Sequence, residues 1–158
     1  MHELSWRWEV LLALRVLAAA ILGGIVGWQR EHVGRAAGVR TFAAVSLGSC
    51  LFGLMSTMSG PSEGGRIAAQ VVTGIGFLCA GVILRDQGRI IGLTTAATLW
   101  ATAAVGLAIA YGWFLLAVLV TILLFILLAA PMKRWERHPT GAPLAAPDDR
   151  KLSPASKE

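Results

Sequence analysis

Apolar runs of roughly the length that crosses a lipid bilayer dominate this chain. Of its 158 residues, 56% are hydrophobic and only 15% are charged, whereas a soluble domain carries about 25% charged residues. A helix that spans the hydrocarbon core needs about 20 mostly apolar residues. The runs and the composition therefore predict an all-α membrane protein with a single domain.

We expect a bundle of five transmembrane helices. The transmembrane domain is expected at residues 10–132, after an external N-terminus at 1–9, with spans at about 10–28, 41–58, 66–84, 90–110 and 113–130. The fourth span is long enough only if Ile90 to Leu93 also lie in the membrane, and a re-entrant segment is the alternative. If its helix begins at Thr95, Thr94 is the expected N-cap. Residues 133–158, rich in proline and mixed charge, are expected to form a disordered tail.

The basic residues predict the orientation. The formal net charge is +5, and the arginines cluster beside apolar spans, which indicates the positive-inside rule rather than nucleic-acid binding. With five spans and the N-terminus outside, most of the 14 lysine and arginine residues lie in the cytoplasm. Trp6, Trp8 and Trp113 then mark the outer interface, and Trp28 and Trp135 the inner one. The sequence therefore predicts a cytoplasmic C-terminus and no nucleic-acid partner.

Small residues recur at helical spacing in several spans. Because lipid is as apolar as the side chains, membrane helices associate where small residues let their backbones approach. The stretch from Gly74 to Trp100 is expected to form a helical hairpin at the centre of the bundle, whereas the leucine-rich last span should face lipid. The residues expected at helix contacts are Gly23, Gly27, Gly74, Gly76, Ala80, Gly81, Thr98, Thr102 and Gly106.

Polar residues gather where the spans end on the expected cytoplasmic side. This group comprises Arg30, Glu31, Arg40, Thr41, Arg85, Thr94 and Thr95. A helix N-terminus beside several arginines attracts an anion or a phosphate group. The alternative is that these arginines only set the orientation and pair with Glu31 and Asp86.

A smaller polar group is expected on the outer side. Arg15 is the one charge within a span, which makes it a functional candidate, although its long side chain can also reach the interface. Arg66 and Gln70 are four residues apart and share a helix face. With Glu63 they form either an outward-facing polar pocket or a satisfied helix end.

The residue types predict neither catalysis nor a metal site. Mg²⁺ prefers carboxylate and water oxygens, and the acidic residues lie outside the spans or at their ends. The three histidines are far apart in sequence, and Ser46 and Ser49 have no neighbouring base. Cys50 and Cys79 are expected to be buried as small hydrophobic residues. We therefore expect no enzyme activity, no metal and no cofactor.

Five motifs resemble the MgtC/SapB family of bacterial membrane proteins. They are GWQRE (27–31), AGVRT (37–41), RIAAQ (66–70), GIGFLCAG (74–81) and GLTTAATLW (92–100). The resemblance implies a multi-pass protein of the bacterial inner membrane, linked to survival in low magnesium and acid stress. For MgtC-like members it also implies action on partner membrane complexes, including the ATP synthase.

The chain departs from the family pattern in three places. Gln29 stands where the family usually has Glu, and Cys79 where it has Gly. The folded cytoplasmic C-terminal domain of MgtC-type members is expected to be missing, which favours the shorter SapB-like branch. Two functional classes follow. The first is a regulator that packs in the bilayer against itself or another inner-membrane protein, and the alternative is a small ion transporter or channel associated with Mg²⁺ homeostasis.

Overall fold

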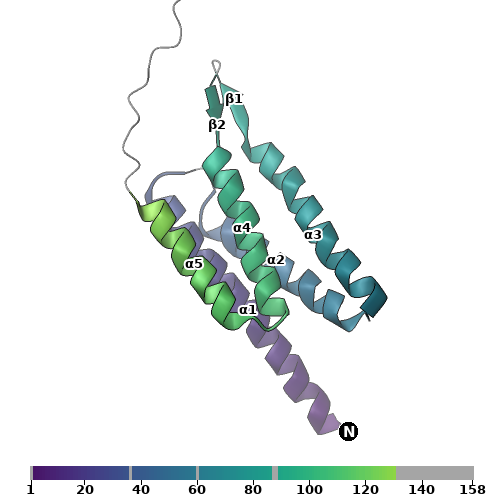
Figure 1. Cartoon of the computed structure of the whole chain (residues 1–158). Helices are drawn as coiled ribbons and strands as arrows, with labels where there is room; N and C mark the ends of the chain where they lie inside the picture. The colour runs from purple at the N-terminus through teal and green to yellow at the C-terminus, as the bar shows by residue number, and fades with distance from the viewer. Residues whose placement is uncertain (1, 36, 60, 87–88, 131–158) are drawn as a thin grey trace, which may run out of the picture.

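Five helices and one small hairpin make up the part of the chain that the computed structural model describes. It describes the backbone of residues 2–35, 37–59, 61–86 and 89–130, and side chains within 6–35, 37–59, 65–83 and 90–130. The elements are α1 (His2–His32), α2 (Val39–Met58), α3 (Pro61–Val82), β1 (Leu84–Asp86), β2 (Arg89–Ile91), α4 (Leu93–Ala110) and α5 (Phe114–Ala129) (Figure 1). The tail predicted at 133–158 lies outside the described residues.

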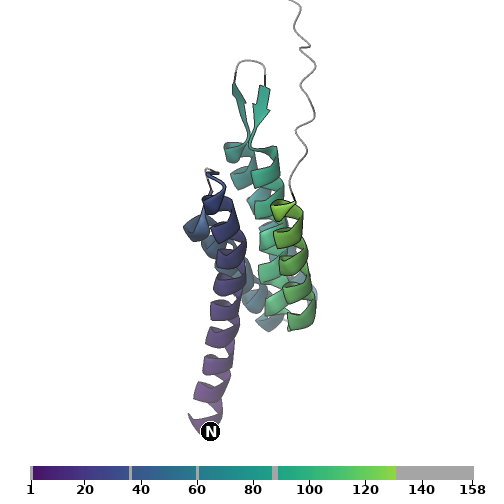
Figure 2. The ribbon, with the colours of Figure 1, turned by 90° about the vertical axis from the view of Figure 1, so that its left-hand side faces the viewer.

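The connection between α3 and α4 is a β-hairpin, where the sequence predicted a loop and the start of a span. β1 and β2 pair antiparallel, with Leu84 opposite Ile91, and project beyond the helices (Figure 2). Branched Ile90 and Ile91 favour the extended backbone. The N-cap of α4 is Gly92 and not Thr94, because only glycine readily adopts the left-handed φ of 92° found there. We call this side of the molecule the hairpin end.

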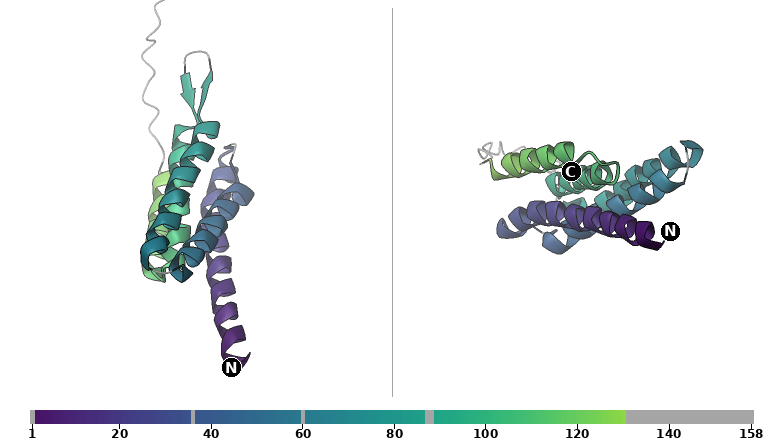
Figure 3. Two further views of the ribbon diagram at one scale, coloured as in Figure 1. Left: turned by 90° about the vertical axis from the view of Figure 1, so that its right-hand side faces the viewer. Right: turned by 90° about the horizontal axis from the view of Figure 1, so that it is seen from below.

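Helix α4 lies at the centre of the bundle. It packs against all four other helices, and Figure 3 shows it between α5 and α1. Its outer neighbour α5 buries only Ala117 and Thr121. Helix α1, the longest, extends past the other helices at its N-terminus (Figure 2).

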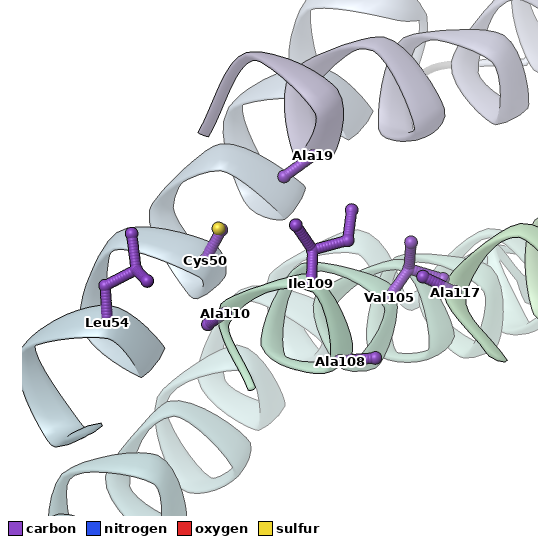
Figure 4. Packing of buried hydrophobic residues seen from close by; sticks show 8 residues of the cluster. All are labelled: Ala19, Cys50, Leu54, Val105, Ala108, Ile109, Ala110 and Ala117. Carbon is purple, nitrogen blue, oxygen red and sulfur yellow. The ribbon is translucent and has the colours of Figure 1, made fainter. Parts of the chain in front are cut away.

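Glycines allow α2 to approach both α1 and α4. A Cβ atom on Gly23 would lie 2.6 Å from the carbonyl oxygen of Phe42, and one on Gly27 would lie 2.7 Å from the Cα of Val39. On the other side of α2, a Cβ atom on Gly106 would collide with the backbone carbonyl of Ser46. The apolar core beside this crossing comprises Ala19, Cys50, Leu54, Val105, Ala108, Ile109, Ala110 and Ala117 (Figure 4).

The structure corrects the predicted position of α3. Its main contacts are with α2 and α4 only, and it stands apart from α1 and α5 (Figure 1). Its buried face is centred on Ile75 and Cys79. The small residues predicted to pack inside the bundle are exposed, and a Cβ atom on three of them would meet open space: Gly74, Gly76 and Gly81, beside exposed Ala80. At ~100° per residue, Gly76 and Ala80 point well away from the direction of Ile75.

Four helices in the described part of the chain are long and apolar enough to cross a membrane. They are Trp6–His32, Val39–Met58, Gly65–Val82 and Leu93–Ala110. The central helix α4 is continuous over its 18 residues. The fifth helix, Phe114–Ala129, is strongly apolar but has 16 residues, about 24 Å at ~1.5 Å per residue.

Candidate functional site

Helix α1 places four polar side chains at the ends of other helices. The first four N–H groups and the last four carbonyls of a helix have no partner within it, so they need other groups. Arg15, Gln29, Arg30 and Glu31 each form a hydrogen bond at such an end. Arg15, Gln29 and Glu31 satisfy a backbone group there. Arg30 instead donates to a threonine hydroxyl.

Arg15 closes the C-terminus of α4. Its Nη1 donates to the carbonyl oxygen of Ala110 at 3.0 Å, and its guanidinium carbon lies 5.6 Å from the ring centre of Phe114. The three preceding carbonyls of α4 accept N–H groups of the next turn. A cation is favourable at a helix C-terminus, where the helix dipole is negative.

The outer polar group predicted from the sequence is divided between two places. Arg15 contacts α4 and α5, whereas Arg66 and Gln70 are exposed and line a mostly apolar groove of about 560 Å³ between α2 and α3. The side chain of Glu63 lies outside the described residues. The structure therefore does not bring Arg15 into a pocket with Arg66 and Gln70.

At the hairpin end, Glu31 closes the N-terminus of α2. Its Oε2 accepts the backbone N–H of Val39, the first residue of α2, at 3.0 Å. A carboxylate at this end is favourable for the helix dipole. Glu31 also lines an open recess of about 390 Å³ with Arg35, Arg40 and Thr41.

Arg30 reaches the N-terminus of α4. Its side chain is only 5% exposed, and its Nη2 donates to the Oγ1 of Thr95 at 2.9 Å. The Nε of Arg30 is buried and has no hydrogen-bond partner. No carboxylate among the described side chains pairs with Arg30. This arginine is therefore a buried cation at the positive end of a helix dipole, which is the less favourable end for it.

Gln29 lies beside Arg30 and closes the C-terminus of α5. It is 8% exposed, its Nε2 donates to the carbonyl oxygen of Leu128 at 2.9 Å, and its Oε1 is buried without a partner. From the sequence, Gln29 stands out only as a departure from a family pattern, and this contact was not predicted. The available signal was an amide at the end of an apolar run, two residues after the small Gly27.

The predicted inner group is thus partly brought together. Arg30 and Thr95 form a hydrogen bond, whereas Arg40 and Thr41 are exposed at the N-terminus of α2. Thr94 is exposed one residue before Thr95. The side chain of Arg85 lies outside the described residues.

The donors at the hairpin end determine which ligand chemistry suits it. Within the described side chains, no group of three or more His, Cys, Asp or Glu residues is placed to hold a metal ion. Cys50 and Cys79 are buried free thiols, and Cys79 donates to the carbonyl oxygen of Ala96 at 3.2 Å. Guanidinium, hydroxyl and backbone N–H groups are donors, and such groups favour an anion over a cation.

Comparison with known proteins identifies similar sequences but no similar solved structure. The model of the MgtC family matches residues 16–137. Protein MgtC of Salmonella typhimurium (strain LT2) is 44% identical over 132 residues, which cover 82% of this chain and 57% of that protein. Protein MgtC of Brucella abortus (strain 2308) is 44% identical over 102 residues, covering 64% and 43%. The chain thus spans about half the length of these relatives. No solved structure matches it.

Proposed function

The chain belongs to the MgtC family of membrane proteins, and on this basis we propose that it is a non-enzymatic regulator in the bacterial inner membrane. We propose that it acts through contacts with itself or with another membrane protein, and that these contacts serve adaptation to low magnesium or acid stress. The observation that carries this proposal is the outward position of the small residues of α3.

The α3 stripe comprises Ala69, Thr73, Gly76 and Ala80, all exposed. Small residues on the surface of a membrane helix give little contact with lipid, but they let a second helix approach closely. Within the chain, such faces of α1 and α4 lie against α2, with Gly23, Gly27 and Gly106 at the contacts. The α3 stripe has the same composition without a neighbour in the described part of the chain, which supports a contact with another helix.

A crosslinking experiment tests this proposal. A photo-reactive amino acid replaces Gly76 in the α3 stripe, where a Cβ atom meets open space and we expect folding to be retained. The matched control replaces Leu123 of α5, which is 56% exposed. We expect a discrete crosslinked species in membranes from position 76 and none from 123, and its mass distinguishes a second copy from another protein. Equal crosslinking at both positions, or none at 76, would contradict the proposal.

Transport of Mg²⁺ is the second candidate, and the polar side chains of α4 do not favour it. Thr98 and Thr102 are buried, and their hydroxyls donate to the carbonyls of Thr94 and Thr98 in the same helix. Arg15 lies at the C-terminus of α4, and its positive charge would repel an incoming cation. We expect no Mg²⁺ flux in sealed liposomes that carry a fluorescent indicator. Saturable uptake by the wild type would reverse the order of the two candidates.

We also propose that all five helices cross the bilayer, with the hairpin end in the cytoplasm. The arginines near this end support that orientation through the positive-inside rule. The short α5 is the helix on which the odd number of spans depends. A phosphatase reporter fused after Ala130 is therefore expected to be inactive, and the same reporter fused after Ser59 active. Activity of the first fusion would remove α5 from the spans.

A further inference from the structure

Two helix N-termini at the hairpin end have opposite electrostatic partners. The N-terminus of α2 is closed by the carboxylate of Glu31, which accepts the N–H of Val39. The N-terminus of α4 instead faces the guanidinium of Arg30, which donates to Thr95 in its first turn. The negative group that balances the first helix has no counterpart at the second among the described side chains.

The first turn of α4 has unused donors. Its N-cap, Gly92, has no side chain, and no side-chain hydrogen bond caps the helix. The first intrahelical bond runs from the N–H of Ala96 to the carbonyl of Gly92. The three N–H groups between these residues therefore have no partner within the helix. Such a group of N–H donors at the positive end of a dipole binds oxyanions.

Arg30 is the second and independent observation. Burial of a charge without a counter-charge is costly. Arg30 is nevertheless only 5% exposed, and its Nε has no hydrogen-bond partner. The bond from its Nη2 to Thr95 holds the guanidinium against the first turn of α4.

Arg15 of helix α1 also reaches an end of α4, but it is the end at which a cation is favourable. Arg15 meets the carbonyl end of the same helix α4, where the dipole favours its charge and its Nη1 donates to the carbonyl of Ala110, although its Nε is also buried without a partner. Arg30 meets the N–H end, where the dipole opposes its charge and, among the described residues, only the Thr95 hydroxyl accepts from its guanidinium. An anion between Arg30 and the first turn of α4 would satisfy both.

We propose that Arg30 and the first turn of α4 bind an oxyanion of the phosphate class. Tetrahedral phosphate oxygens accept from a guanidinium fork and from backbone N–H groups at once. The anion reaches the turn from the side of Thr94, which is exposed. The shared chemistry comes either from free phosphate or from the headgroup of an anionic lipid. The proposal does not depend on the α3 stripe and can fail separately from it.

The test uses the full chain in maltoside micelles, which contain no phosphate group. In one arm inorganic phosphate is titrated against chloride at constant ionic strength. In the other, phosphatidylglycerol is added to the micelles without free phosphate, with phosphatidylcholine as the zwitterionic comparison. We expect a saturable rise in melting temperature in at least one arm. Phosphorus NMR of the wild type measures the binding directly, as broadening of the phosphate signal.

Two variants of the site and one matched control decide the assignment. Arg30→Lys keeps the charge but loses the fork, so apparent affinity is expected to fall at least about tenfold. Thr95→Val removes the hydroxyl that holds Arg30 and is expected to weaken binding in the same direction. Arg15→Lys makes the same change in the arginine of α1 that contacts the C-terminus of α4. The affinity of this variant for the anion is expected to stay within about twofold of wild type.

The outcomes distinguish free phosphate from a lipid headgroup as the ligand, and they also show whether the proposal fails. A response to inorganic phosphate assigns a free anion, and a response to phosphatidylglycerol alone assigns a lipid headgroup. No signal broadening and no thermal shift in either arm would overturn the proposal. So would a response that survives both Arg30→Lys and Thr95→Val. If Arg30→Lys does not fold, Thr95→Val with the direct NMR measurement gives the decision.

Discussion

Helices α3 and α4 carry similar stripes of small residues, yet only α4 lies inside the bundle. Both stripes repeat about every fourth residue, from Ala69 to Ala80 in α3 and from Thr94 to Gly106 in α4. The α4 stripe lies against α2 at Gly106, whereas the α3 stripe faces away from every described neighbour. A small-residue stripe therefore predicts that another helix can approach, but not that this helix belongs to the same chain.

Two further differences explain why α4 is the central helix. Its small residues are not limited to one stripe, because Ala96, Ala103 and Ala108 are also buried on other sides. Its two ends are hydrogen-bonded by Arg15 and Arg30 of α1. Helix α3 instead packs one face, around Ile75, against α2 and α4, and exposes bulky residues such as Phe77.

The largest expected difference in stability between the two helices comes from adding a bulky side chain to each stripe. Gly106→Leu places a side chain where even a Cβ atom collides with the backbone of Ser46, so we expect a loss of at least about 3 kcal/mol or no folded protein. Gly76→Leu meets open space and should change stability by less than about 0.5 kcal/mol. Unfolding of both variants in detergent measures the difference. Equal losses of stability would mean that the α3 stripe is packed inside the bundle as the α4 stripe is.

The ends of α4 give the next effect. Arg15→Leu leaves the carbonyl of Ala110 without its donor, and a buried unsatisfied acceptor costs about 1–3 kcal/mol. The control, Gln70→Leu, changes an exposed polar residue of α3 and should cost less than about 0.5 kcal/mol. Detergent melts of the two variants check this order. A loss for Gln70→Leu that matches Arg15→Leu would show that α3 also depends on polar contacts.

Much of the fold was predictable because hydropathy and turn residues bound the apolar runs. The span predicted at 41–58 is α2 at Val39–Met58. Helix α1 begins at His2 and not near residue 10, because apolar runs mark what can lie in lipid and not where a helix ends. The β-hairpin was missed, since Ile90 and Ile91 are compatible with both a strand and a membrane span.

The site was predictable as a region but not as contacts. Sequence placed several arginines and Thr95 at one end of the bundle, and the structure selects Arg30 as the one that reaches Thr95. That selection depends on the rotation of α1 about its axis, which is fixed by the approach of Gly23 and Gly27 to α2. A single apolar helix with small residues on several sides does not reveal this rotation, and for the same reason the contact of Gln29 was missed.

The smallest expected effect concerns the hydroxyls of the two stripes. Thr102 is fully buried and donates to the carbonyl of Thr98 at 2.8 Å, while exposed Thr73 donates to the carbonyl of Ala69 at 3.2 Å. Valine has nearly the shape of threonine, and each carbonyl keeps the N–H bond of its helix. Thr102→Val should therefore cost at most about 1 kcal/mol, near the strength of side-chain hydrogen bonds inside membrane proteins. Thr73→Val should cost less than about 0.5 kcal/mol.

The same pair of variants sharpens the choice between regulator and transporter. If the Thr102 hydroxyl only satisfies its own helix, Thr102→Val stays folded and keeps its cellular activity, since no ion or substrate uses that oxygen. In a pathway through the bundle, the buried hydroxyls of α4 would be the ligands, and activity would fall while the protein stays folded. A melt and a growth assay at low magnesium, run on these two variants and on Gly76→Leu, separate these results. Retained activity in Thr102→Val together with lost activity in Gly76→Leu would locate function on the outward face of α3.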